Sequence, residues 1–444
     1  MNAHGDRPSR PQFLMLGFGI TGKAVCEFAV AHRYPIVVSE GGPLAHEKKM
    51  WLQKHDIPFE DCGHTLALLS RADTVVLSPG IPVDLPIVVE ARRRGLAVIS
   101  EIDLALRYME ACPVVAVTGT NGKSSTVEVI AKILHTQGHR AWVAGNIGTP
   151  LISLVHEVAS SDTLVLEMSS YQLEQSLEFH PNVALLLTLT PDHLHRHGTM
   201  KAYAAAKANV FANQGPGDVA ILPHSLASQF DHGHARRIFY DDASQELPSG
   251  AETLLPHEQS NLRAALAACQ ALVPAFDVSK VSMTLIAHTF RLPHRMEPVG
   301  SVRGVAIIND SKSTNAGSTI AALRSIQDPV ILLLGGHSKG AGYEALVDEC
   351  GESTLREVIL FGEAADELNV LFSLNNSKRV PISVAQSMKD AVDRGLAAAQ
   401  MGDVLLLSPA CSSFDAFSNY VQRGEAFTEL IRSKPGFTPP ESRT

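Results

Sequence analysis

Short apolar runs alternate with helical patterns along most of this chain. Runs such as Val114–Val117, Val183–Leu189 and Val330–Leu334 each lead into a turn that is rich in glycine or polar residues. Because a parallel strand needs a crossover segment before the next strand, this alternation predicts parallel sheets covered by helices. The sequence therefore predicts an α/β fold, and the absence of a repeat of about 20–50 residues argues against a solenoid.

The pattern divides the chain into three α/β units. A length of 444 residues fits domains of roughly 100–200 residues each. We expect the units at residues 1–101, 102–292 and 293–444. The expected strands are Phe13–Leu16, Ile36–Ser39, Thr74–Leu77, Ala97–Ile99, Val114–Val117, Ala141–Ala144, Leu164–Glu167, Val183–Leu189, Val305–Asn309, Val330–Leu334, Val358–Phe361 and Val404–Leu407. The expected helices include Met200–Ala212, Asn261–Leu272, Ser318–Ser325 and Met388–Ala399.

Composition and charge exclude several classes of protein. Hydrophobic residues make up 45% of the chain and charged residues 19%, which excludes a mostly disordered protein. The net charge of −9 argues weakly against broad nucleic-acid or membrane-surface binding, and it leaves room for a local basic pocket. We expect small-molecule substrates and a monomer. No apolar run approaches the about 20 residues that span a bilayer, residues 1–12 are polar, and the six cysteines are scattered. These features predict a cytoplasmic protein with reduced thiols.

The segment Gly119–Ser125 follows a buried run and precedes a helical pattern. Backbone N–H groups in such a turn, with a helix N-terminus behind them, bind phosphate oxygens. In this interpretation Lys123 reaches the terminal phosphates, and the hydroxyl of Ser124 or Ser125 binds Mg²⁺. The turn is shorter than a full Walker motif, because the residue six before Lys123 is Val117. A glycine turn with an exposed lysine is the alternative, and the flanking strand and helix disfavour it.

A second glycine turn, Gly17–Gly22, has the pattern G-x-G-x-x-G between the strand Phe13–Leu16 and a helical segment. Glu40 follows the next strand, near the place of the ribose-binding carboxylate in dinucleotide-binding folds. Taken alone, this favours NAD, but the pattern requires only that a diphosphate approach the backbone closely, so a UDP-sugar also satisfies it. A tight turn without a ligand is the third possibility. Two such turns predict two phosphorylated ligands, an energy donor at Lys123 and a substrate at Gly17–Gly22.

Polar residues follow other expected strands, where open α/β sheets bind ligands. Glu167 ends one strand and is placed to hold Mg²⁺, although a carboxylate at a strand end is also common without a metal. Residues 190–197 contain an aspartate and three histidines, a spacing that fits a metal site and a plain loop equally well. No H-x-x-x-H pattern on a clear helix supports zinc. Lys207, in an alanine-rich helical segment, has by itself the pattern of a solvated lysine.

The third unit carries polar segments of the same kind. Residues 310–315, 335–340 and 408–415 each follow an expected strand. The arginine, aspartate and lysine among residues 295–312 suit a phosphate and a ribose, and Thr314 or Asn315 is the expected N-cap of the next helix. We interpret Cys411 as a small residue at a tight turn, since no base is apparent beside it.

These motifs, in this order, resemble the Mur ligases, the ATP-dependent amide-forming enzymes of peptidoglycan synthesis. The resemblance runs from Gly17 to about Glu425. Residues 119–123 (GTNGK) are shared with folylpolyglutamate synthases and indicate only the superfamily. The segments EMSSYQLE at 167–174, DSKSTN at 310–315 and LSPACSSFD at 407–415 are similar to the D-glutamate-adding member. The Asp-Asn-Pro motif expected late in the diaminopimelate- or lysine-adding relative does not occur.

The resemblance implies a Rossmann-like N-terminal domain for a UDP-linked substrate, a central P-loop ATPase domain, and a Rossmann-like C-terminal domain for the incoming amino acid. It implies an ADP-forming ligase that adds D-glutamate to UDP-N-acetylmuramoyl-L-alanine through an acyl phosphate. ATP and two Mg²⁺ ions are the implied cofactors, and the C-terminal domain is expected to close over the central site.

The resemblance also implies roles for individual residues. The residues expected to hold ATP are Gly119, Thr120, Asn121, Gly122, Lys123, Ser124, Ser125, Asn261, Arg295 and Asp310. Those expected to hold the UDP-sugar and its muramoyl part are Ile20, Thr21, Glu40, Ser78, Asn146, Ser169 and Gln172. Those expected to form the D-glutamate pocket are Thr314, Lys339, Ser413, Phe414 and Tyr420. The expected metal ligands are Ser124, Glu167, His193 and Lys207, and the residues expected to act in catalysis are Lys123, His193, Lys207, Lys312 and Lys339.

Two positions need separate comment. Lys207 is expected to be carbamylated, because an ammonium repels Mg²⁺ whereas a carbamate supplies anionic oxygens. Glu258 follows His257 where the family usually has asparagine. This substitution puts a carboxylate near the expected adenine site, so we expect it to affect the adenine contacts and to leave the phosphate site unchanged.

Three other functions compete with this interpretation. Another ligase of the superfamily, such as a folylpolyglutamate synthase, is disfavoured by the Gly17–Gly22 turn. An NAD-dependent oxidoreductase with an accessory nucleotide site would use that same turn for its cofactor. A non-catalytic nucleotide-binding scaffold is disfavoured because Lys123, Glu167 and His193 are all present.

Overall fold

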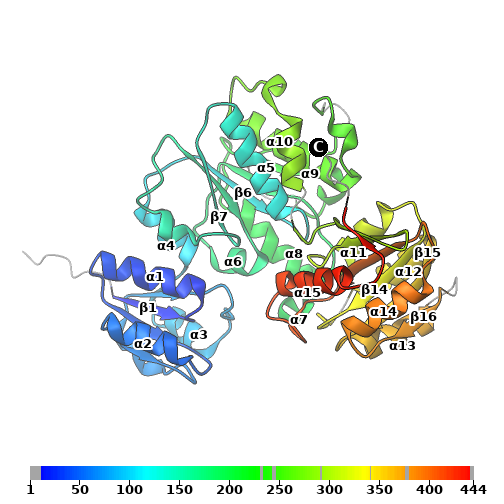
Figure 1. Ribbon diagram of the computed structural model, residues 1–444. Coiled ribbons are helices and arrows are strands. Elements are labelled where there is room, and N and C mark those ends of the chain that lie inside the picture. Colours follow the sequence, from blue (N-terminus) through cyan, green and yellow to red (C-terminus); the bar gives the residue numbers. More distant parts are fainter. Residues whose placement is uncertain are drawn as a thin grey trace, which may run out of the picture.

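The computed structural model describes residues 12–230, 234–242, 247–290, 293–340, 342–375 and 380–440. It contains three sheets, which Figure 1 shows as three helix-flanked bodies with the N-terminal and C-terminal bodies set against different sides of the central one. Two sheets are wholly parallel and the third is mixed, so the α/β fold predicted from the alternating pattern is confirmed. In the described part of the chain, no helix combines the length and the apolar character needed to cross a bilayer.

The N-terminal sheet has five parallel strands in the order β3-β2-β1-β4-β5. Its elements are β1 (Phe13–Leu16), α1 (Ile20–Ala31), β2 (Ile36–Ser39), α2 (His46–Lys54), β3 (Phe59–Glu60), η1 (Leu66–Arg71), β4 (Thr74–Leu77), α3 (Pro86–Arg93) and β5 (Ala97–Ser100). Every residue of β1, β2 and β4 is buried, as expected when helices cover both faces. The strand order reverses between β1 and β4, which places Gly17 and Ser78 at the switch point where such sheets bind ligands.

The central sheet has six parallel strands in the order β11-β10-β9-β6-β8-β7. Its strands are β6 (Val114–Thr118), β7 (Ala141–Gly145), β8 (Thr163–Glu167), β9 (Val183–Leu186), β10 (Val219–Leu222) and β11 (Arg236–Phe239). Its helices are α4 (Glu101–Tyr108), α5 (Lys123–Thr136), η2 (Leu151–Leu154), α6 (Ser170–Gln175), α7 (Leu194–His197), α8 (Met200–Ala208), η3 (Asn209–Phe211), η4 (His224–Leu226), η5 (Ala251–Thr253), α9 (Pro256–Leu272), η6 (Val278–Lys280) and α10 (Met283–Phe290). The register pairs Glu167 with Val117 on one side and with Gly145 on the other. Glu167 therefore lies beside the start of the segment Gly119–Ser125 (the phosphate turn).

The C-terminal sheet has seven strands in the order β16-β15-β14-β17-β13-β12-β18. Its elements are β12 (Glu297–Val302), β13 (Val305–Asn309), α11 (Ala316–Arg324), β14 (Val330–Gly335), α12 (Glu344–Glu352), β15 (Leu355–Phe361), α13 (Ala365–Asn375), β16 (Ile382–Val384), α14 (Met388–Ala398), β17 (Val404–Ala410), α15 (Tyr420–Arg432) and β18 (Phe437–Thr438). Strand β12 runs antiparallel to both β13 and β18. Strand β17, in contrast, pairs in parallel with β13 and with β14. Asn315 is the N-cap of α11, because its side chain accepts a hydrogen bond from the Ser318 N–H.

Several expected element bounds are wrong by a few residues, and six strands in the described part of the chain were not anticipated, namely β3, β10, β11, β12, β16 and β18. Helix α9 begins at Pro256 rather than Asn261, since proline is accepted in a first helical turn. Strand β9 ends at Leu186, and the next residues bond to the phosphate turn instead: Leu187 N–H to Thr118 O and Thr120 N–H to Thr188 O. Strand β12 escaped prediction because Pro298 and Gly300 interrupt its alternation and its register shifts there.

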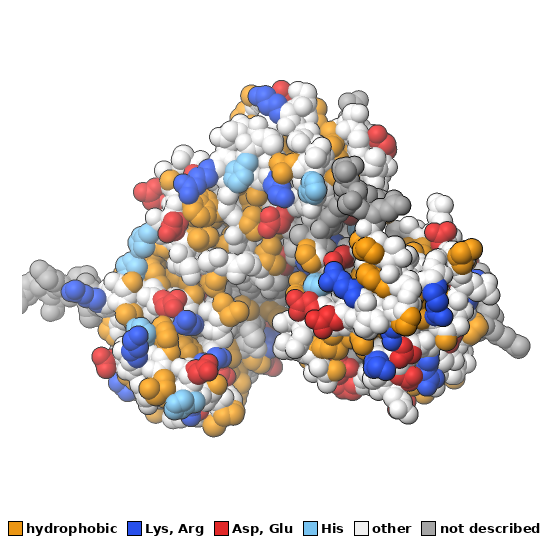
Figure 2. All heavy atoms as spheres, in the orientation of Figure 1, with side chains coloured by type: hydrophobic (Ala, Val, Ile, Leu, Met, Phe, Trp, Pro, Cys, Tyr) orange, Lys and Arg blue, Asp and Glu red, His pale blue; other side chains and the backbone are white. Residues whose placement is uncertain are grey.

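Charges on the surface are mixed. On the face that Figure 2 shows, acidic and basic side chains are interspersed over all three bodies, and no large basic patch gathers there.

The N-terminal and central bodies share one apolar core. A single cluster of buried side chains runs from the N-terminal sheet through α4 into one face of the central sheet. Glu101, at the start of α4, is 3% exposed, and its carboxyl accepts a hydrogen bond of 2.7 Å from the Ile152 N–H. Burial in this core raises the pKa of Glu101 to about 7.

The substitution Glu101→Gln is therefore expected to stabilise the protein at pH 8. An unfolded glutamate has a pKa of about 4.3, so the folded state binds this proton more tightly; the contribution is fully present below about pH 4 and is lost as the pH rises through about 7. Glutamine keeps an acceptor for Ile152 and never ionises. We expect a gain on the order of 2 kcal/mol at pH 8 and a much smaller one at pH 5, measured by thermal unfolding. Equal gains at both pH values would contradict the assignment.

Candidate functional site

A cavity of about 410 Å³ lies between the central and C-terminal bodies. The phosphate turn and the segment after β9 form its central wall, and the start of α11 and the segment after β14 form the opposite wall. The residues expected to function that line it are Thr120, Asn121, Gly122, Lys123, Ser124, His193, Asn261, Arg295, Asp310, Lys312, Thr314 and Lys339. Residues that the sequence assigned to two separate units thus form one site.

At Gly122 the phosphate turn has a backbone conformation that favours glycine. Gly122 adopts a φ of +86°, and a Cβ atom there would lie 2.5 Å from Asn261 Oδ1. Lys123 begins α5, and its ammonium donates hydrogen bonds to the carbonyl oxygens of Gly119 (2.9 Å) and Thr120 (2.8 Å). Burial lowers the pKa of Lys123, while the carboxylates of Glu167 and Asp192 oppose that shift. The turn therefore combines a helix N-terminus with a cation directly above it, the arrangement that binds phosphate.

Glu167 and His193 stand on either side of this turn. Glu167 Oε1 accepts a hydrogen bond of 2.8 Å from Asn146 Nδ2, whereas Glu167 Oε2 is buried and has no hydrogen-bond partner among the residues that the structure describes. His193 adopts a positive φ of 54°, and its Nδ1 lies 3.1 Å from the Tyr171 hydroxyl. A buried carboxylate oxygen without a partner is costly unless a cation or a donor faces it. Its place fits the expected metal.

The donor set near Glu167 suits Mg²⁺ rather than zinc. Among the described residues, no three His, Cys, Asp or Glu side chains gather closely enough to hold a metal. Mg²⁺ is usually bound through one or two carboxylates together with substrate phosphates and waters, so it does not need a complete protein cage. Ser124 lines the cavity, whereas Ser125 is buried and its hydroxyl is bonded to Arg295.

Lys207 is a buried lysine, and no carboxylate in the described part of the chain accepts a hydrogen bond from it. It is 1% exposed, and its amine donates to Gly119 O at 2.8 Å and to Thr118 Oγ1 at 3.4 Å. Burial lowers the pKa of Lys207 well below its ordinary value, and the charge of Lys123 adds to that shift. The prediction of a solvated lysine, drawn from the helical pattern alone, is therefore wrong. The amine of Lys207 lies directly under the phosphate turn.

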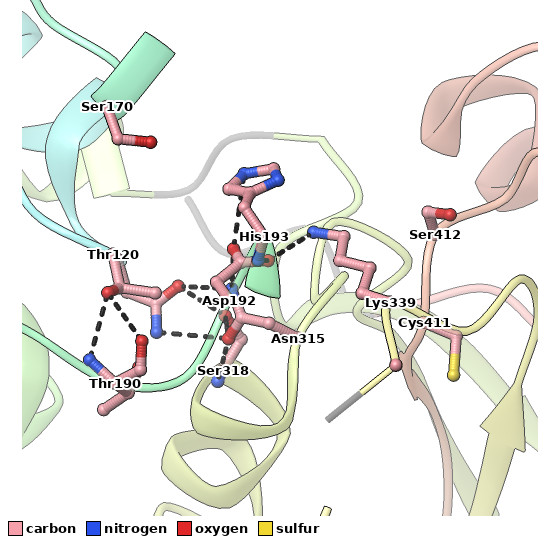
Figure 3. Close-up of polar contacts among 12 residues, drawn as sticks. Thr120, Ser170, Thr190, Asp192, His193, Asn315, Ser318, Lys339, Cys411 and Ser412 are labelled. Atoms are coloured by element: carbon pink, nitrogen blue, oxygen red, sulfur yellow. Dashed lines mark hydrogen bonds and ion pairs between the residues drawn. The ribbon is translucent and has the colours of Figure 1, made fainter. Parts of the chain in front are cut away.

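The C-terminal body contacts the central body here through three polar side chains, those of Lys339, Asn315 and Ser318 (Figure 3). Lys339 forms an ion pair of 2.9 Å with Asp192. The Asn315 amide donates to Asn121 Oδ1 at 3.0 Å and to Asp192 Oδ2 at 3.3 Å, and Ser318 Oγ donates to Asn121 Oδ1 at 2.9 Å. Asp192 and Ser318 were not among the site residues predicted from the sequence, and Asn315 was predicted only as a helix N-cap. Their segments follow strands and carry a polar cap, but nothing in the sequence indicates that they meet.

Three further charged residues from the C-terminal body face the cavity. Asp310 accepts hydrogen bonds from the hydroxyls of Ser313 and Ser408 and from the Met296 N–H, and burial raises its pKa to about 6. Burial lowers the pKa of Lys312 to about 8, with the nearby Arg295 adding to the shift. Through these hydrogen bonds Asp310 holds the loops that carry Arg295 and Lys312.

The unusual Glu258 caps a helix. Its carboxylate accepts a hydrogen bond of 2.9 Å from the Leu255 N–H at the start of α9, where a negative charge is favourable. His257 lines the cavity beside it, and burial together with Arg295 lowers the pKa of His257 to about 4. A neutral imidazole at this position supplies both a flat ring and a hydrogen-bonding nitrogen, and it was not among the residues chosen from the sequence.

The residues expected to hold the UDP-sugar lie outside the cavity. Glu40 accepts hydrogen bonds from the Phe18 N–H (2.7 Å) and the Gly42 N–H (3.3 Å), so it shapes the first glycine turn. Ile20 is 80% exposed at the start of α1. Ser169 and Gln172 form a capping box at the start of α6, a structural role that their residue types also explain.

The other residues expected to hold D-glutamate lie outside the cavity lining. Ser413 is buried, Phe414 is 71% exposed, and the Tyr420 ring lies 5.6 Å from Lys312 Nζ. None of these three lines the cavity, in contrast to Thr314 and Lys339. The free thiol of Cys411 is buried and hydrogen-bonded to the Tyr343 hydroxyl, and burial raises its pKa to about 11, which agrees with a structural role.

A brace connects the N-terminal switch point to the central site. Gln175, 2% exposed at the end of α6, donates from its amide to the carbonyl oxygens of Ile81 (2.7 Å), Ser78 (3.3 Å) and Pro79 (3.4 Å). Arg196, on α7 next to His193, donates to Ile81 O at 3.3 Å. The turn after β4 is thus tied to the helices that carry the site.

Comparison with known proteins shows the family to which the chain belongs. The models "MurD N-terminal domain", "Mur ligase middle domain" and "Mur ligase, glutamate ligase domain" match residues 12–85, 117–247 and 294–411. A Desulfotalea psychrophila protein named UDP-N-acetylmuramoylalanine–D-glutamate ligase is 37% identical over 446 residues, which cover 94% of this chain and 95% of the relative. The chain belongs to the Mur ligase family.

A second relative supports this membership, and a solved structure shows the same fold. A Geotalea uraniireducens protein with the same name is 37% identical to this Mur ligase over 458 residues, 95% of this chain and 97% of the relative. The crystal structure of MurF ligase from Thermotoga maritima in complex with ADP has the same fold, with a TM-score of 0.56. That structure is 16% identical and covers 95% of this chain and 94% of its own.

The brace gives a test of the connection between the N-terminal and central bodies. In Gln175→Met the three carbonyl oxygens lose their shared donor, so we expect amide hydrogen exchange at residues 78–81 to accelerate roughly tenfold. Hydrogen exchange with mass spectrometry measures this. Gln137→Met is the matched control, because the Gln137 amide bonds to Asp277 within the central body and its loss should leave residues 78–81 unchanged. Unaltered exchange in Gln175→Met would show that the brace contributes nothing.

Proposed function

We propose that this Mur ligase joins D-glutamate to UDP-N-acetylmuramoyl-L-alanine with hydrolysis of ATP to ADP and phosphate, in peptidoglycan synthesis. The observation that carries the proposal is the shared cavity: the phosphate turn faces cationic side chains of the C-terminal body across it. The names of the full-length relatives indicate the two substrates. Substrates of this kind and six free cysteines support a cytoplasmic location.

The reaction is proposed to run in two steps. An oxygen of the substrate carboxylate attacks the γ-phosphorus of ATP, which forms an acyl phosphate and releases ADP. The amine of D-glutamate then attacks the acyl carbon, a C–N bond forms, and the C–O bond to phosphate breaks. One carboxylate, one ammonium and one ATP thus give an amide, ADP, phosphate and one proton.

The residues of the cavity are suited to these steps by charge. Lys123 at the N-terminus of α5, together with Arg295 and Lys312 from the C-terminal body, puts cationic charge around the space where negative charge develops on the phosphate. Thr120, Asn121, Gly122 and Ser124 would hold the phosphates, and His257 and Asn261 lie where the nucleoside would follow. Because one wall belongs to each body, a shift of the C-terminal body would open or close the site.

Glu167, His193 and Ser124 would hold Mg²⁺, and the partnerless Glu167 Oε2 supports this assignment. The metal would neutralise phosphate oxygens when bound. Lys207 lies on the same side of the turn, bonded to Gly119 O. A neutral amine reacts with carbon dioxide whereas an ammonium does not, so its lowered pKa favours a carbamate there. The carbamate would add a second anionic group beside Glu167.

The N-terminal turn would hold the uridine diphosphate. Ile20, Thr21, Glu40 and Ser78 lie near the switch point of the first sheet. Asn146 is bonded to Glu167, and Ser169 and Gln172 cap the start of α6, the helix whose end carries Gln175. The Gln175 brace fixes the turn after β4 relative to α6, which would hold the substrate carboxylate at a constant distance from the phosphate turn. Thr314 and Lys339 would meet D-glutamate in the cavity, and Ser413, Phe414 and Tyr420 would complete its pocket after closure.

The proposed activity can be tested with a panel of amino acids. Phosphate release in the presence of ATP, Mg²⁺ and UDP-N-acetylmuramoyl-L-alanine is expected with D-glutamate and to be at least 100-fold slower with L-glutamate, L-alanine or meso-diaminopimelate. In Lys123→Ala, phosphate release should fall about 1000-fold while the UDP-substrate binds nearly as before. Release that depends on another amino acid, or loss of both properties in the variant, would contradict the assignment.

The modification of Lys207 has a readout that does not depend on activity. With ¹³C-bicarbonate at pH 8 we expect one carbamate signal in the carbon NMR spectrum that Mg²⁺ and ATP strengthen. The signal should vanish in Lys207→Arg and persist in Lys132→Arg, a matched control whose lysine is bonded to Thr289 Oγ1 instead. A spectrum without a signal that depends on Lys207 would exclude the carbamate.

A further inference from the structure

Two histidines meet where the N-terminal and central bodies join. His32 is the C-cap residue of α1, and His156 lies in the turn after η2. Helix α1 packs against η2, and Figure 1 shows α1 on the side of the N-terminal body that faces the central one. The Nε2 atoms of the two rings are 2.7 Å apart, and the rings are stacked with their centroids 4.8 Å apart. The mechanism above gives neither residue a role.

The backbone sets the tautomer of His32. Its Nδ1 lies 2.8 Å from the carbonyl oxygen of Phe28, which can only accept a hydrogen bond, so Nδ1 carries a proton. In the neutral ring Nε2 then carries the lone pair and faces His156. The Phe28 ring, with its centroid 4.3 Å away, supports the imidazole from one side. Metal-binding histidines have the same arrangement, because a backbone carbonyl commonly fixes one ring nitrogen while the other binds the ion.

A divalent transition-metal ion can take the place of the proton that lies between the two Nε2 atoms. We propose that His32 and His156 form a binding site for such an ion, of the class of Zn²⁺, Ni²⁺ and Cu²⁺, that bridges the N-terminal and central bodies. On binding, His156 moves its proton from Nε2 to Nδ1 through water, so both Nε2 lone pairs face the ion and no proton is released. Imidazole suits these ions, whereas Mg²⁺ prefers oxygen ligands.

The distance between the two nitrogens is close to what such an ion requires. Imidazole nitrogens bind Zn²⁺ at about 2.0–2.1 Å, so two of them lie roughly 2.9 Å apart at right angles and roughly 3.3 Å apart in a tetrahedral site. The observed separation of 2.7 Å must therefore widen by a few tenths of an ångström, which the exposed His156 can accommodate. No third His, Cys, Asp or Glu of the described chain completes a metal-binding group, so water would fill the other positions.

The ion would connect two elements that are each fixed within their own body. The Ile152 N–H of η2 donates to the Glu101 carboxyl at 2.7 Å, which ties η2 to the start of α4. His32 ends α1, the helix that begins in the Gly17–Gly22 turn. A bridge between His32 and His156 therefore ties the helix behind this turn to the central body. Because the two rings meet only in the folded protein, the bound ion stabilises the folded arrangement.

The first test measures Zn²⁺ binding to the full chain by titration calorimetry, with ADP and excess Mg²⁺ present to occupy the phosphate cavity. His156→Gln should weaken binding at least about tenfold, because a glutamine amide still donates to His32 Nε2 but is a poor ligand for zinc. His156→Cys should restore binding, since a thiolate is a good ligand. His180→Gln is the matched control: its ring is bonded to Asp218, so its loss should leave binding unchanged.

The site also has a readout in stability and one in spectroscopy. Zn²⁺ at about 100 times its Kd should raise the melting temperature of the wild type by roughly 2–5 °C and that of His156→Gln by much less. With Cu²⁺ in place of Zn²⁺, electron spin echo spectra should show two imidazole nitrogens on the ion in the wild type and one in His156→Gln.

Three results would overturn the inference. They are a Zn²⁺ affinity that both His156→Gln and His32→Phe leave unchanged, a Cu²⁺ spectrum that the loss of either ring does not alter, and a wild-type melting temperature that Zn²⁺ does not raise. The last result would show that the pair is only a hydrogen bond. If His32→Phe fails to fold, His156→Gln decides the question by itself. The proposed ligase activity is judged separately, because neither histidine lines the cavity.

Discussion

The site depends on the carboxyl ends of neighbouring parallel strands. In the central sheet β9, β6, β8 and β7 are adjacent, and the residues that follow them are Asp192 and His193, the phosphate turn, Glu167 at the end of β8, and Asn146. The register that pairs Glu167 with both Val117 and Gly145 sets its position beside the turn. Parallel pairing brings these ends to one edge of the sheet, so groups distant in sequence share a site without any long loop.

Burial of charge is the second constraint. Lys123, Lys207, Lys312 and Arg295 all lie in or under the cavity, and burial lowers the pKa of each. Such a concentration of cations suits a site that receives a triphosphate, whose negative charge compensates them. Three carboxylates at the site each have a bonded neighbour. Glu167 accepts a hydrogen bond from Asn146, Asp310 accepts hydrogen bonds from two serines, and Asp192 forms an ion pair with Lys339.

The strands β1, β2, β4, β6, β8, β14 and β17 could be predicted because their apolar runs are nearly continuous, as expected for strands buried on both faces. Strand β12 could not, since a bulge and an antiparallel neighbour give it no comparable pattern. The motif residues were predicted from their spacing and from the family resemblance. That resemblance indicated both Lys123 and Lys339. The burial of Lys207 and the capping role of Glu258 needed coordinates, because a helical pattern does not reveal which neighbours a side chain meets.

The sequence alone determined the α/β class, the positions of the two glycine turns, and the family, because each depends on local pattern or on contiguous motifs. The tertiary structure decided that the phosphate turn and the C-terminal body form one cavity, and that Asp192, Asn315 and Lys339 meet in it. These contacts join residues separated by more than 120 positions. Their pairing depends on how separate sheets pack, and no local preference of the chain encodes that packing.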